Sequence, residues 1–305
     1  MIKYSNSVFN NEEEVKNFVM ECEEDFELQL HQAVDFICLK EKLPFITLAG
    51  PTCSGKTTAA KKIVELLKVR FIDANIISID DFYYDTKKLK EISHQKGMTS
   101  IDYDSIDTID VEDLERFVEE VLDPDTREVH CPIFDFNQGK RVGYRAIECS
   151  ENSIFIFEGI QALYPRIQEI LSDRILTNIY ICTQSSIDIL GKIFMPNDIR
   201  FLRRLVRDYK FRSTSPEFTF QIWNNVRKNE DESIFPYSNL CEIKIDSVFA
   251  CEISLLKPYL VRILSELKGN ETYGKTAEDI LNKISDIDII PEEYISKDSL
   301  YREFI

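Results

Sequence analysis

The stretch of sequence that decides the fold is Gly50-Pro51-Thr52-Cys53-Ser54-Gly55-Lys56-Thr57-Thr58. Its two glycines stand five positions apart and are followed by Lys and Thr, which is the pattern of a phosphate-binding loop. The apolar run 45–49 precedes it and is typical of a buried strand, and residues 59–67 follow with the apolar spacing of a helix. The sequence therefore predicts a strand, a phosphate loop and a helix in succession. These flanking elements disfavour a chance match.

The chemistry of phosphate binding explains this residue order. Gly50 and Gly55 allow backbone angles that other residues resist, so that backbone N–H groups can close around phosphate oxygens. The start of the following helix directs free amides and its positive dipole end at the same anion. We expect Lys56 to reach the β- and γ-phosphates and the Thr57 hydroxyl to ligate Mg²⁺. Nucleotide binding is thus predicted for Gly50, Thr52, Cys53, Ser54, Gly55, Lys56, Thr57 and Thr58.

Composition limits the class of protein. The chain has 305 residues, of which 44% are apolar, enough for one large α/β domain with appendages. The absence of a long apolar run and of a signal-peptide pattern predicts no membrane partner, and the net charge of −17 disfavours nucleic acid. The eight cysteines lack paired spacing, which suits reduced thiols and a cytoplasmic location. The sequence leaves a homo-oligomer open.

Strands and helices are expected to alternate along the chain. The apolar and periodic patterns predict strands at 45–49, 75–79, 154–157, 178–182 and 242–246, and helices at 11–41, 111–122, 161–171, 198–209, 218–228 and 252–268. Residues 128–149 read as a β-hairpin, and the polar stretch 86–100 as a mobile surface loop. The predicted fold class is α/β, a P-loop NTPase-type doubly wound parallel sheet with a small β-hairpin insertion and a helical lid.

Two acids follow the second predicted strand. Asp80 and Asp81 stand at its carboxyl end, where ligands collect in parallel sheets. A carboxylate there can accept the proton of an attacking hydroxyl and help to hold Mg²⁺, and we assign both roles to Asp80. We assign Asp81 to capping a turn, which is also the alternative for Asp80.

A third acid, Glu158, ends the apolar run 154–157. An ionised Glu on a buried strand is costly without a cation beside it. We therefore expect Glu158 to orient Mg²⁺, as a Walker-B-type carboxylate does. The alternative is a salt-bridged strand terminus.

A basic segment lies within the predicted helix 198–209. Its arginines at 200, 203, 204 and 207 recur at spacings of three and four, which places them on one helix face. Arginine suits phosphates because its fork is planar and bidentate. We expect a lid at about 198–216 that closes over the γ-phosphate and excludes water. The alternative is a solvated basic face paired with acids.

Together these stretches resemble the uridine kinase/phosphoribulokinase family of P-loop kinases, in order over residues 44 to about 260. The resemblance implies ATP and Mg²⁺ as cofactors, with Gly50–Thr58 as the ATP loop and Phe157-Glu158-Gly159 as a family motif. Asp80-Asp81-Phe82-Tyr83 is similar to the acceptor-site segment, and this implies Asp80 as catalytic base and Tyr83 beside the substrate. Arg203-Arg204-Leu205-Val206-Arg207-Asp208 resembles the lid, which implies cofactor contact for Arg203 and catalytic roles for Arg204, Arg207 and Lys56.

The same resemblance implies a nucleoside as the small-molecule substrate. Tyr103-Asp104-Ser105-Ile106-Asp107 is similar to a segment whose first Asp contacts the ribose, which implies that role for Asp104. Pro132-Ile133-Phe134-Asp135-Phe136 and Arg141 are similar to residues near the base. Phe134 stands where the family has Tyr, and Gly139 where it has a base-reading His, so the resemblance leaves the base open.

The sequence thus predicts a helical lead-in at 1–43, a P-loop kinase domain at 44–268 and a polar C-terminal extension at 269–305 with one short helix near 276–284. The expected activity is phosphorylation of the ribose hydroxyl of a nucleoside by Mg-ATP. Two alternatives remain: a kinase of another small alcohol, as in phosphoribulokinase or pantothenate kinase, and a nucleotide-binding regulator without turnover.

Overall fold

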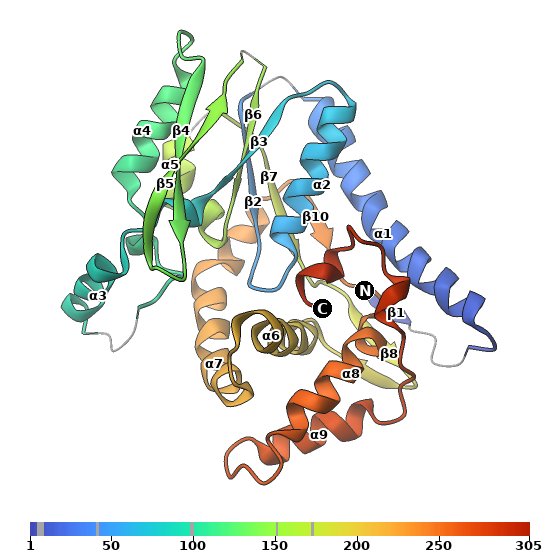
Figure 1. Ribbon diagram of the computed structural model, residues 1–305. Coiled ribbons are helices and arrows are strands. Elements are labelled where there is room, and N and C mark those ends of the chain that lie inside the picture. Colours follow the sequence, from blue (N-terminus) through green and yellow to red (C-terminus); the bar gives the residue numbers. More distant parts are fainter. Residues whose placement is uncertain (5–8, 41–42, 98–100, 151, 172–173) are drawn as a thin grey trace.

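The computed structural model describes residues 1–4, 9–40, 43–97, 101–150, 152–171 and 174–305 (Figure 1). Its central sheet has five strands in the order β10-β7-β2-β6-β3, and every neighbouring pair is parallel. These strands are β2 Phe45–Ala49, β3 Ala74–Ser78, β6 Ile154–Glu158, β7 Ile175–Cys182 and β10 Ile243–Asp246. The predicted α/β class with a parallel sheet is confirmed.

Helices lie on both sides of this sheet (Figure 1). Their bounds are α1 Glu12–Cys38, α2 Lys56–Val69, α3 Thr86–Gln95, α4 Val111–Leu122, α5 Pro165–Leu171, α6 Pro196–Arg212, α7 Pro216–Ser233, α8 Glu252–Ser265 and α9 Gly274–Ile284. Short 3₁₀ turns join them at η1 Ile79–Phe82, η2 Ile106–Thr108, η3 Ile160–Leu163, η5 Phe235–Leu240, η6 Glu292–Tyr294 and η7 Leu300–Glu303.

The alternation of side chains along the strands gives each face of the sheet its own core. In β2, Ile46 and Leu48 join a core formed with α1, α2, α6 and α8. Phe45 and Ala49 point to the other face and join a core formed with α4 and α5. Because both faces are covered, the central strands are apolar at nearly every position, which is why they could be predicted as continuous apolar runs.

Smaller sheets lie at the edges of the molecule. The predicted hairpin is confirmed as β4 Glu128–Asp135 paired antiparallel with β5 Lys140–Glu148. A second small sheet, which the sequence did not predict, joins β1 Ile2–Tyr4, β8 Ser186–Ile189 and β9 Lys192–Phe194. Its strands are too short to show a period, and its hairpin turns at Leu190 and Gly191, both with positive φ, instead of at an Asn-Gly pair.

The prediction of an irregular loop over residues 86–100 is wrong for α3, Thr86–Gln95, and residues 98–100 lie outside the described part of the chain. Only Leu89 and Ser93 of this helix are buried, one turn apart, and apart from the half-buried Ile92 the rest is charged or polar. A helix with a single buried apolar side chain has too weak an apolar stripe to be recognised by periodicity.

The C-terminal segment belongs to the core. Beyond α9, the chain returns through η6 and η7 and ends beside the start of α2 (Figure 1). Leu300, Tyr301, Phe304 and Ile305 are buried in the core that also holds α2 and α8. The expectation of a polar appendage therefore described the composition of residues 269–305 and missed their packing.

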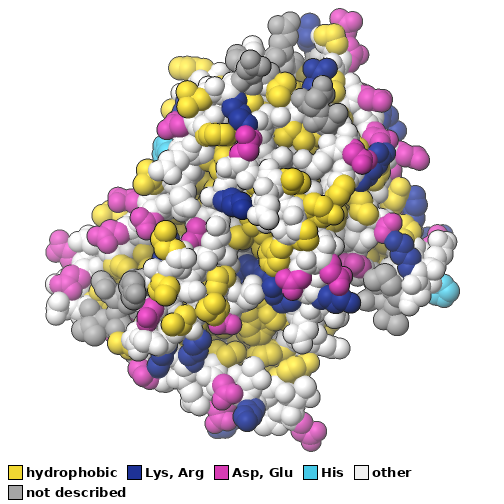
Figure 2. Space-filling view, turned by 180° about the vertical axis from the view of Figure 1, so that it is seen from behind, with side chains coloured by type: hydrophobic (Ala, Val, Ile, Leu, Met, Phe, Trp, Pro, Cys, Tyr) yellow, Lys and Arg dark blue, Asp and Glu magenta, His cyan; other side chains and the backbone are white. Residues whose placement is uncertain are grey.

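The acidic side chains are spread over the visible surface and do not form one patch there (Figure 2). On this face they are interspersed with Lys and Arg. This pattern fits a role of the net charge of −17 in solubility.

Two buried ion pairs fasten α6 to its neighbours. Arg203 Nε donates to Glu252 of α8 at 2.7 Å, with both side chains fully buried, and Arg200 Nη1 donates to Glu230 of α7 at 2.6 Å. Removing one partner of such a pair destabilises the fold, because the remaining buried charge has neither an opposite charge nor water to stabilise it.

We predict that Glu252→Gln lowers the free energy of unfolding by about 3–5 kcal/mol, since it leaves the Arg203 guanidinium uncompensated. Urea unfolding followed by circular dichroism measures this loss. The double variant Arg203→Met/Glu252→Leu should be less destabilised than the single variant. Equal or greater destabilisation of the double variant would contradict the charge argument.

Candidate active site

The phosphate loop runs from the end of β2 to the start of α2. Gly55 has φ of 85° and caps α2, so this position requires the left-handed conformation that glycine adopts freely. Gly50 does not have a positive φ. A Cβ at residue 50 would lie 2.0 Å from the carbonyl oxygen of Ile181, so Gly50 is required for space. The expectation that both glycines serve backbone angles is therefore correct only for Gly55.

The loop is suited to an anion with several oxygens. Ser54 Oγ is buried without a hydrogen-bond partner, and Lys56 Nζ donates to the Pro51 carbonyl oxygen at 3.1 Å within the same loop. The amides at the start of α2 have no helical acceptor, and Thr57 is exposed beside them. An orphan hydroxyl, an ammonium and free amides thus surround one end of a 14-residue helix.

Strand register brings the two predicted acids to this loop. Glu158, the last residue of β6, pairs in register with Leu48 of β2 on one side and with Ser78 of β3 on the other. Leu48 is two residues before Gly50, and Ser78 is two residues before Asp80. The structure therefore brings Glu158, Asp80 and the phosphate loop to one edge of the sheet.

The electrostatics of Glu158 show how close these groups are. Burial raises the pKa of Glu158 to about 7, the charge of Lys56 opposes the shift, and the carboxylate of Asp80 adds to it. Burial likewise raises the pKa of Asp80, while contact with the Tyr83 hydroxyl and the charge of Lys56 lower it. Both carboxylates thus respond to the same ammonium group. A cation placed between them would relieve the cost of their ionisation.

Asp81 is directed elsewhere. Its Oδ1 accepts a hydrogen bond from the backbone N–H of Phe134 at 3.1 Å, and its Oδ2 lies 3.8 Å from Arg145. These contacts join η1 to the hairpin, so Asp81 has a structural partner, and of the two aspartates only Asp80 has its pKa lowered by the charge of Lys56.

A cavity of about 360 Å³ lies between η2, α5 and α7. Asp104 lines it, and burial raises the pKa of Asp104 to about 6, with the charges of Asp102 and Asp80 adding to the shift and Arg204 opposing it. The other side chains that line it include Asp102, Tyr164, Arg166, Asn229, Glu232 and Tyr237. Asp104 therefore lines a cavity large enough for a small molecule and is close enough to Asp80 for their charges to interact.

The other predicted acceptor residues do not line this cavity. The Tyr83 hydroxyl donates to the carbonyl oxygen of Tyr103 at 2.7 Å, and its ring stands edge-on to buried Phe134 at 5.6 Å. Arg141 donates to Asp113 at 2.6 Å and to the Phe82 carbonyl oxygen at 3.1 Å. In this structure Phe134 is a core residue, and Arg141 fastens the hairpin to α4 and η1.

The arginines of α6 do not act as one face, although their spacing predicted a single face directed at the phosphates. Arg200 and Arg203 hold the phosphate loop, and Arg204 and Arg207 pair with Asp208. Arg200 Nη1 and Arg203 Nη1 each donate at 3.2 Å to a carbonyl oxygen of the phosphate loop, those of Thr52 and Cys53 respectively. Arg203 also donates to Ser247, Glu252 and Tyr301, so all of its N–H groups have acceptors. Arg203 is fully buried and supports the loop backbone in this structure, and its contact with a cofactor stays a prediction.

Arg204 and Arg207 face different parts of the site. Both donate to Asp208, and the charge of Arg204 lowers the pKa of Asp104, whereas Arg207 lines a cavity together with Thr57 and Thr58 of the loop. The apolar side of α6 is buried against α7 and α8. This helix is therefore a packed element in this structure, and its action as a lid over the γ-phosphate stays a prediction.

Several residues of the site were missed from the sequence. Asp208 is buried and pairs with Arg204, Arg207 and Arg212, and its spacing of four from Arg204 and from Arg212 was a usable signal. Arg212 is near enough to lower the pKa of Asp80. Gln161 is fully buried, and its Nε2 donates to Tyr83 and Tyr103; nothing in its sequence context marked it.

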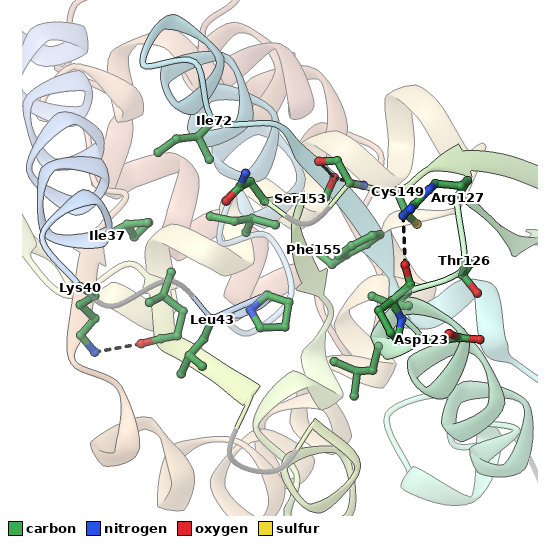
Figure 3. Close-up of a pocket in the computed structure, with 18 of the residues that line it drawn as sticks. Ile37, Lys40, Leu43, Ile72, Asp123, Thr126, Arg127, Cys149, Ser153 and Phe155 are labelled. Carbon is green, nitrogen blue, oxygen red and sulfur yellow. Dashed lines mark hydrogen bonds between the residues drawn. The ribbon is translucent and has the colours of Figure 1, made fainter.

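Other features of the molecule bear less on this site. A separate pocket of about 420 Å³ is lined by Leu43, Ile72 and Phe155 among others, at the amino ends of the strands and thus opposite the phosphate loop (Figure 3). Within the described ranges, no three His, Cys, Asp or Glu side chains gather as a metal site. No helix in the described part of the chain is both long and apolar enough to cross a bilayer.

The fold and the loop define an α/β nucleotide-binding protein of the P-loop class. More specifically, the chain belongs to the phosphoribulokinase/uridine kinase family, whose sequence model matches residues 45–254. The predicted family is thus confirmed.

Two curated relatives share 25% and 33% of their aligned residues with this chain. Uridine-cytidine kinase C of Dictyostelium discoideum is 25% identical over 239 residues, which cover 78% of this chain and 46% of that protein. Uridine kinase of Schizosaccharomyces pombe is 33% identical over 193 residues, covering 63% of this chain and 37% of that protein. The chain thus spans less than half the length of these curated relatives. D-glycerate 3-kinase of Cryptococcus neoformans has a similar fold, with a TM-score of 0.50 at 14% identity, covering 67% of this chain and 88% of that one.

We predict that Glu158→Gln stabilises the protein at pH 8 and not at pH 4.5. With a pKa of about 7 against an ordinary 4.5, folded wild type holds an extra proton between these values, so its stability falls as pH rises through that window. The full difference is at most about 3 kcal/mol, from 1.36 kcal/mol per pH unit. Urea unfolding at both pH values measures it.

Glu148→Gln, at an exposed position on β5, is the matched control and should change neither value. A Glu158→Gln difference that is equal at the two pH values would show that burial of the charge is not its cause.

Proposed function

We propose that the protein is a Mg-ATP-dependent kinase that phosphorylates a ribose hydroxyl of a nucleoside. The observation that carries this proposal is the common edge where Lys56, Asp80 and Glu158 meet the phosphate loop, next to the cavity that Asp104 lines. A protein that only bound nucleotide would not require Asp80, an acid with a raised pKa, beside the phosphate loop and near the Asp104 cavity.

Each group has a distinct part in the transfer. The loop amides, Ser54 and Lys56 would hold the triphosphate, and Thr57 with Glu158 and Asp80 would hold Mg²⁺, an ion that takes one or two carboxylates together with phosphate oxygens. Mg²⁺, when bound, neutralises charge on the phosphates. Asp80 accepts the proton of the acceptor hydroxyl. At the same time the hydroxyl oxygen forms a bond to the γ-phosphorus, and the bond between the γ-phosphorus and ADP breaks. Arg204 and Arg207 steady the transferring group.

The raised pKa of Asp80 suits this role. A base is most effective when its pKa is near the working pH, and burial moves Asp80 in that direction. Lys56 still favours the ionised form that a base requires.

The chemistry of the acceptor cavity favours a nucleoside over a sugar phosphate. Asp102, Asp104 and Glu232 line it, and its one cation, Arg166, already pairs with Glu115 and Glu169. An acidic cavity repels a phosphorylated acceptor and accepts hydroxyl donors. Tyr164 and Tyr237, with ring centroids 6.5 Å apart, add two aromatic surfaces for a base.

Names of relatives agree with this choice, since both curated relatives described above are uridine or uridine-cytidine kinases. We extend the nucleoside acceptor to this chain as a proposal, together with a cytoplasmic location, for which the eight free thiols are suited. A panel of nucleosides, sugar phosphates and other small alcohols, assayed for ADP release, tests the acceptor. The proposal would be overturned if ADP were released only with a sugar phosphate, or if none of the acceptors in the panel gave ADP release.

We predict that Asp80→Asn lowers kcat by about 10²–10⁴-fold, because the proton acceptor is lost, and leaves ATP binding within a few-fold of wild type, because the loop, Lys56, Thr57 and Glu158 remain to hold Mg-ATP. Steady-state kinetics and calorimetric titration with ATP measure the two effects. Asp81→Asn is the matched control, one residue away and directed at the hairpin, and should keep a kcat within about tenfold. Unchanged turnover in Asp80→Asn would show that Asp80 is not the base.

A further inference from the structure

A second cavity lies on the other side of the phosphate loop. It measures about 460 Å³, follows α2 from Thr57 and Thr58, and has no lining residue in common with the acceptor cavity. Its far wall comes from the C-terminal segment. Six cations, at Lys61, Lys62, Arg207, Arg212, Lys297 and Arg302, line it together with three acids at Glu65, Asp298 and Glu303. A basic cavity that opens from the phosphate loop is suited to the remainder of a bound nucleotide.

The C-terminal segment is held firmly against the loop. Tyr301 is fully buried, and its hydroxyl accepts a hydrogen bond from Arg203 at 3.1 Å. The Leu300 side chain covers Gly55 so closely that a Cβ there would lie 2.2 Å from Leu300 Cδ1. The Phe304 and Tyr301 rings pack edge to face at 5.8 Å. Glu303, between these anchors, is therefore held in position and is not part of a loose tail.

Glu303 occupies the point where this cavity meets the loop. Its Oε2 accepts a hydrogen bond from Thr58 Oγ1 at 3.3 Å. It lines the cavity together with Arg207 and Thr57. Glu303 is partly exposed, and its second oxygen, which accepts no hydrogen bond from the residues that the structure describes, can meet a ligand.

A carboxylate beside a phosphate site is unfavourable unless the ligand gives it a hydrogen bond. The parts of a nucleoside triphosphate that can do so next to the phosphates are the sugar hydroxyls, and acidic side chains take this role in dinucleotide-binding folds. Two cations of the cavity are directed away from Glu303, because Arg302 donates to the backbone carbonyls of Glu292 and Ile295 and Lys62 pairs with Glu27.

We propose that Glu303 accepts a hydrogen bond from a sugar hydroxyl of the phosphate donor, and so makes the protein select ribonucleotide over deoxyribonucleotide donors. This inference rests on the proposed function only in that the donor is a nucleotide seated in the phosphate loop. It does not depend on which acceptor is used.

The test is nucleotide binding to the full chain, without an acceptor, measured by calorimetry with ATP, 2′-deoxy-ATP and 3′-deoxy-ATP in Mg²⁺. Wild type should bind ATP at least about tenfold more tightly than one deoxy analogue, the usual effect of losing a hydrogen bond to a charged group. In Glu303→Ala this ratio should fall to within about twofold, through weaker ATP binding with the binding of that analogue unchanged.

Glu65→Ala is the matched control, an acid that lines the same cavity about 10 Å further along α2, at 1.5 Å per residue from Thr58, and it should keep the wild-type ratio. Glu303→Gln retains an acceptor and should give an intermediate ratio. Thermal melts of each variant show whether it is folded.

Three results would overturn the inference. One is equal binding of all three nucleotides by wild type. Another is an equal loss for all three in folded Glu303→Ala, which would give Glu303 only a structural role. The third is a Glu303→Ala defect that disappears without Mg²⁺, which would make Glu303 a metal-site residue. Failure of wild type to bind any nucleotide would instead overturn the proposed function, and this inference with it.

Discussion

The site depends on the parallel register of three strands. Because Glu158 lies level with Leu48 and Ser78, the end of β6 is fixed between the phosphate loop and the turn that carries Asp80. A slip of one residue would direct Glu158 to the opposite face of the sheet. The apolar side chains that pack on both faces prevent such a slip. The same burial that fixes the register also raises the pKa values of both acids, so that packing and reactivity have one cause.

The loop itself is supported from behind by buried charge. Arg200 and Arg203 each bind a loop carbonyl and each pair with a glutamate of a neighbouring helix. Cys53 has a φ of 58°, a conformation that residues other than glycine seldom adopt, and its carbonyl is one of those held. The C-terminal segment completes this support through Tyr301. Elements far apart in the chain therefore support the phosphate loop, residues 50–58. This support gives Arg200 and Arg203 of α6 a structural role in an acidic protein.

Much of this could be predicted from sequence because the signals were local. The loop, the strands before and after it, and the positions of Asp80 and Glu158 at strand ends follow from short motifs and apolar runs. The partners of Arg203 could not be predicted, because Glu252 and Tyr301 lie 49 and 98 residues away and no period relates them. Phe134 and Arg141 were assigned by resemblance alone, and the structure gives both of them structural contacts. The packing of the C-terminal segment could not be predicted, because its apolar residues, such as Leu300 and Phe304, are scattered among charges.

The central claim is that Asp80 and Glu158 serve one metal beside the phosphate loop. A crystal structure of the full chain with Mg²⁺ and a non-hydrolysable ATP analogue tests it most directly. The account predicts a metal that contacts the Thr57 hydroxyl and phosphate oxygens, with each carboxylate bound to it at about 2.1 Å or through a single water. A triphosphate seated in the loop with either carboxylate beyond the reach of one bridging water would contradict the account.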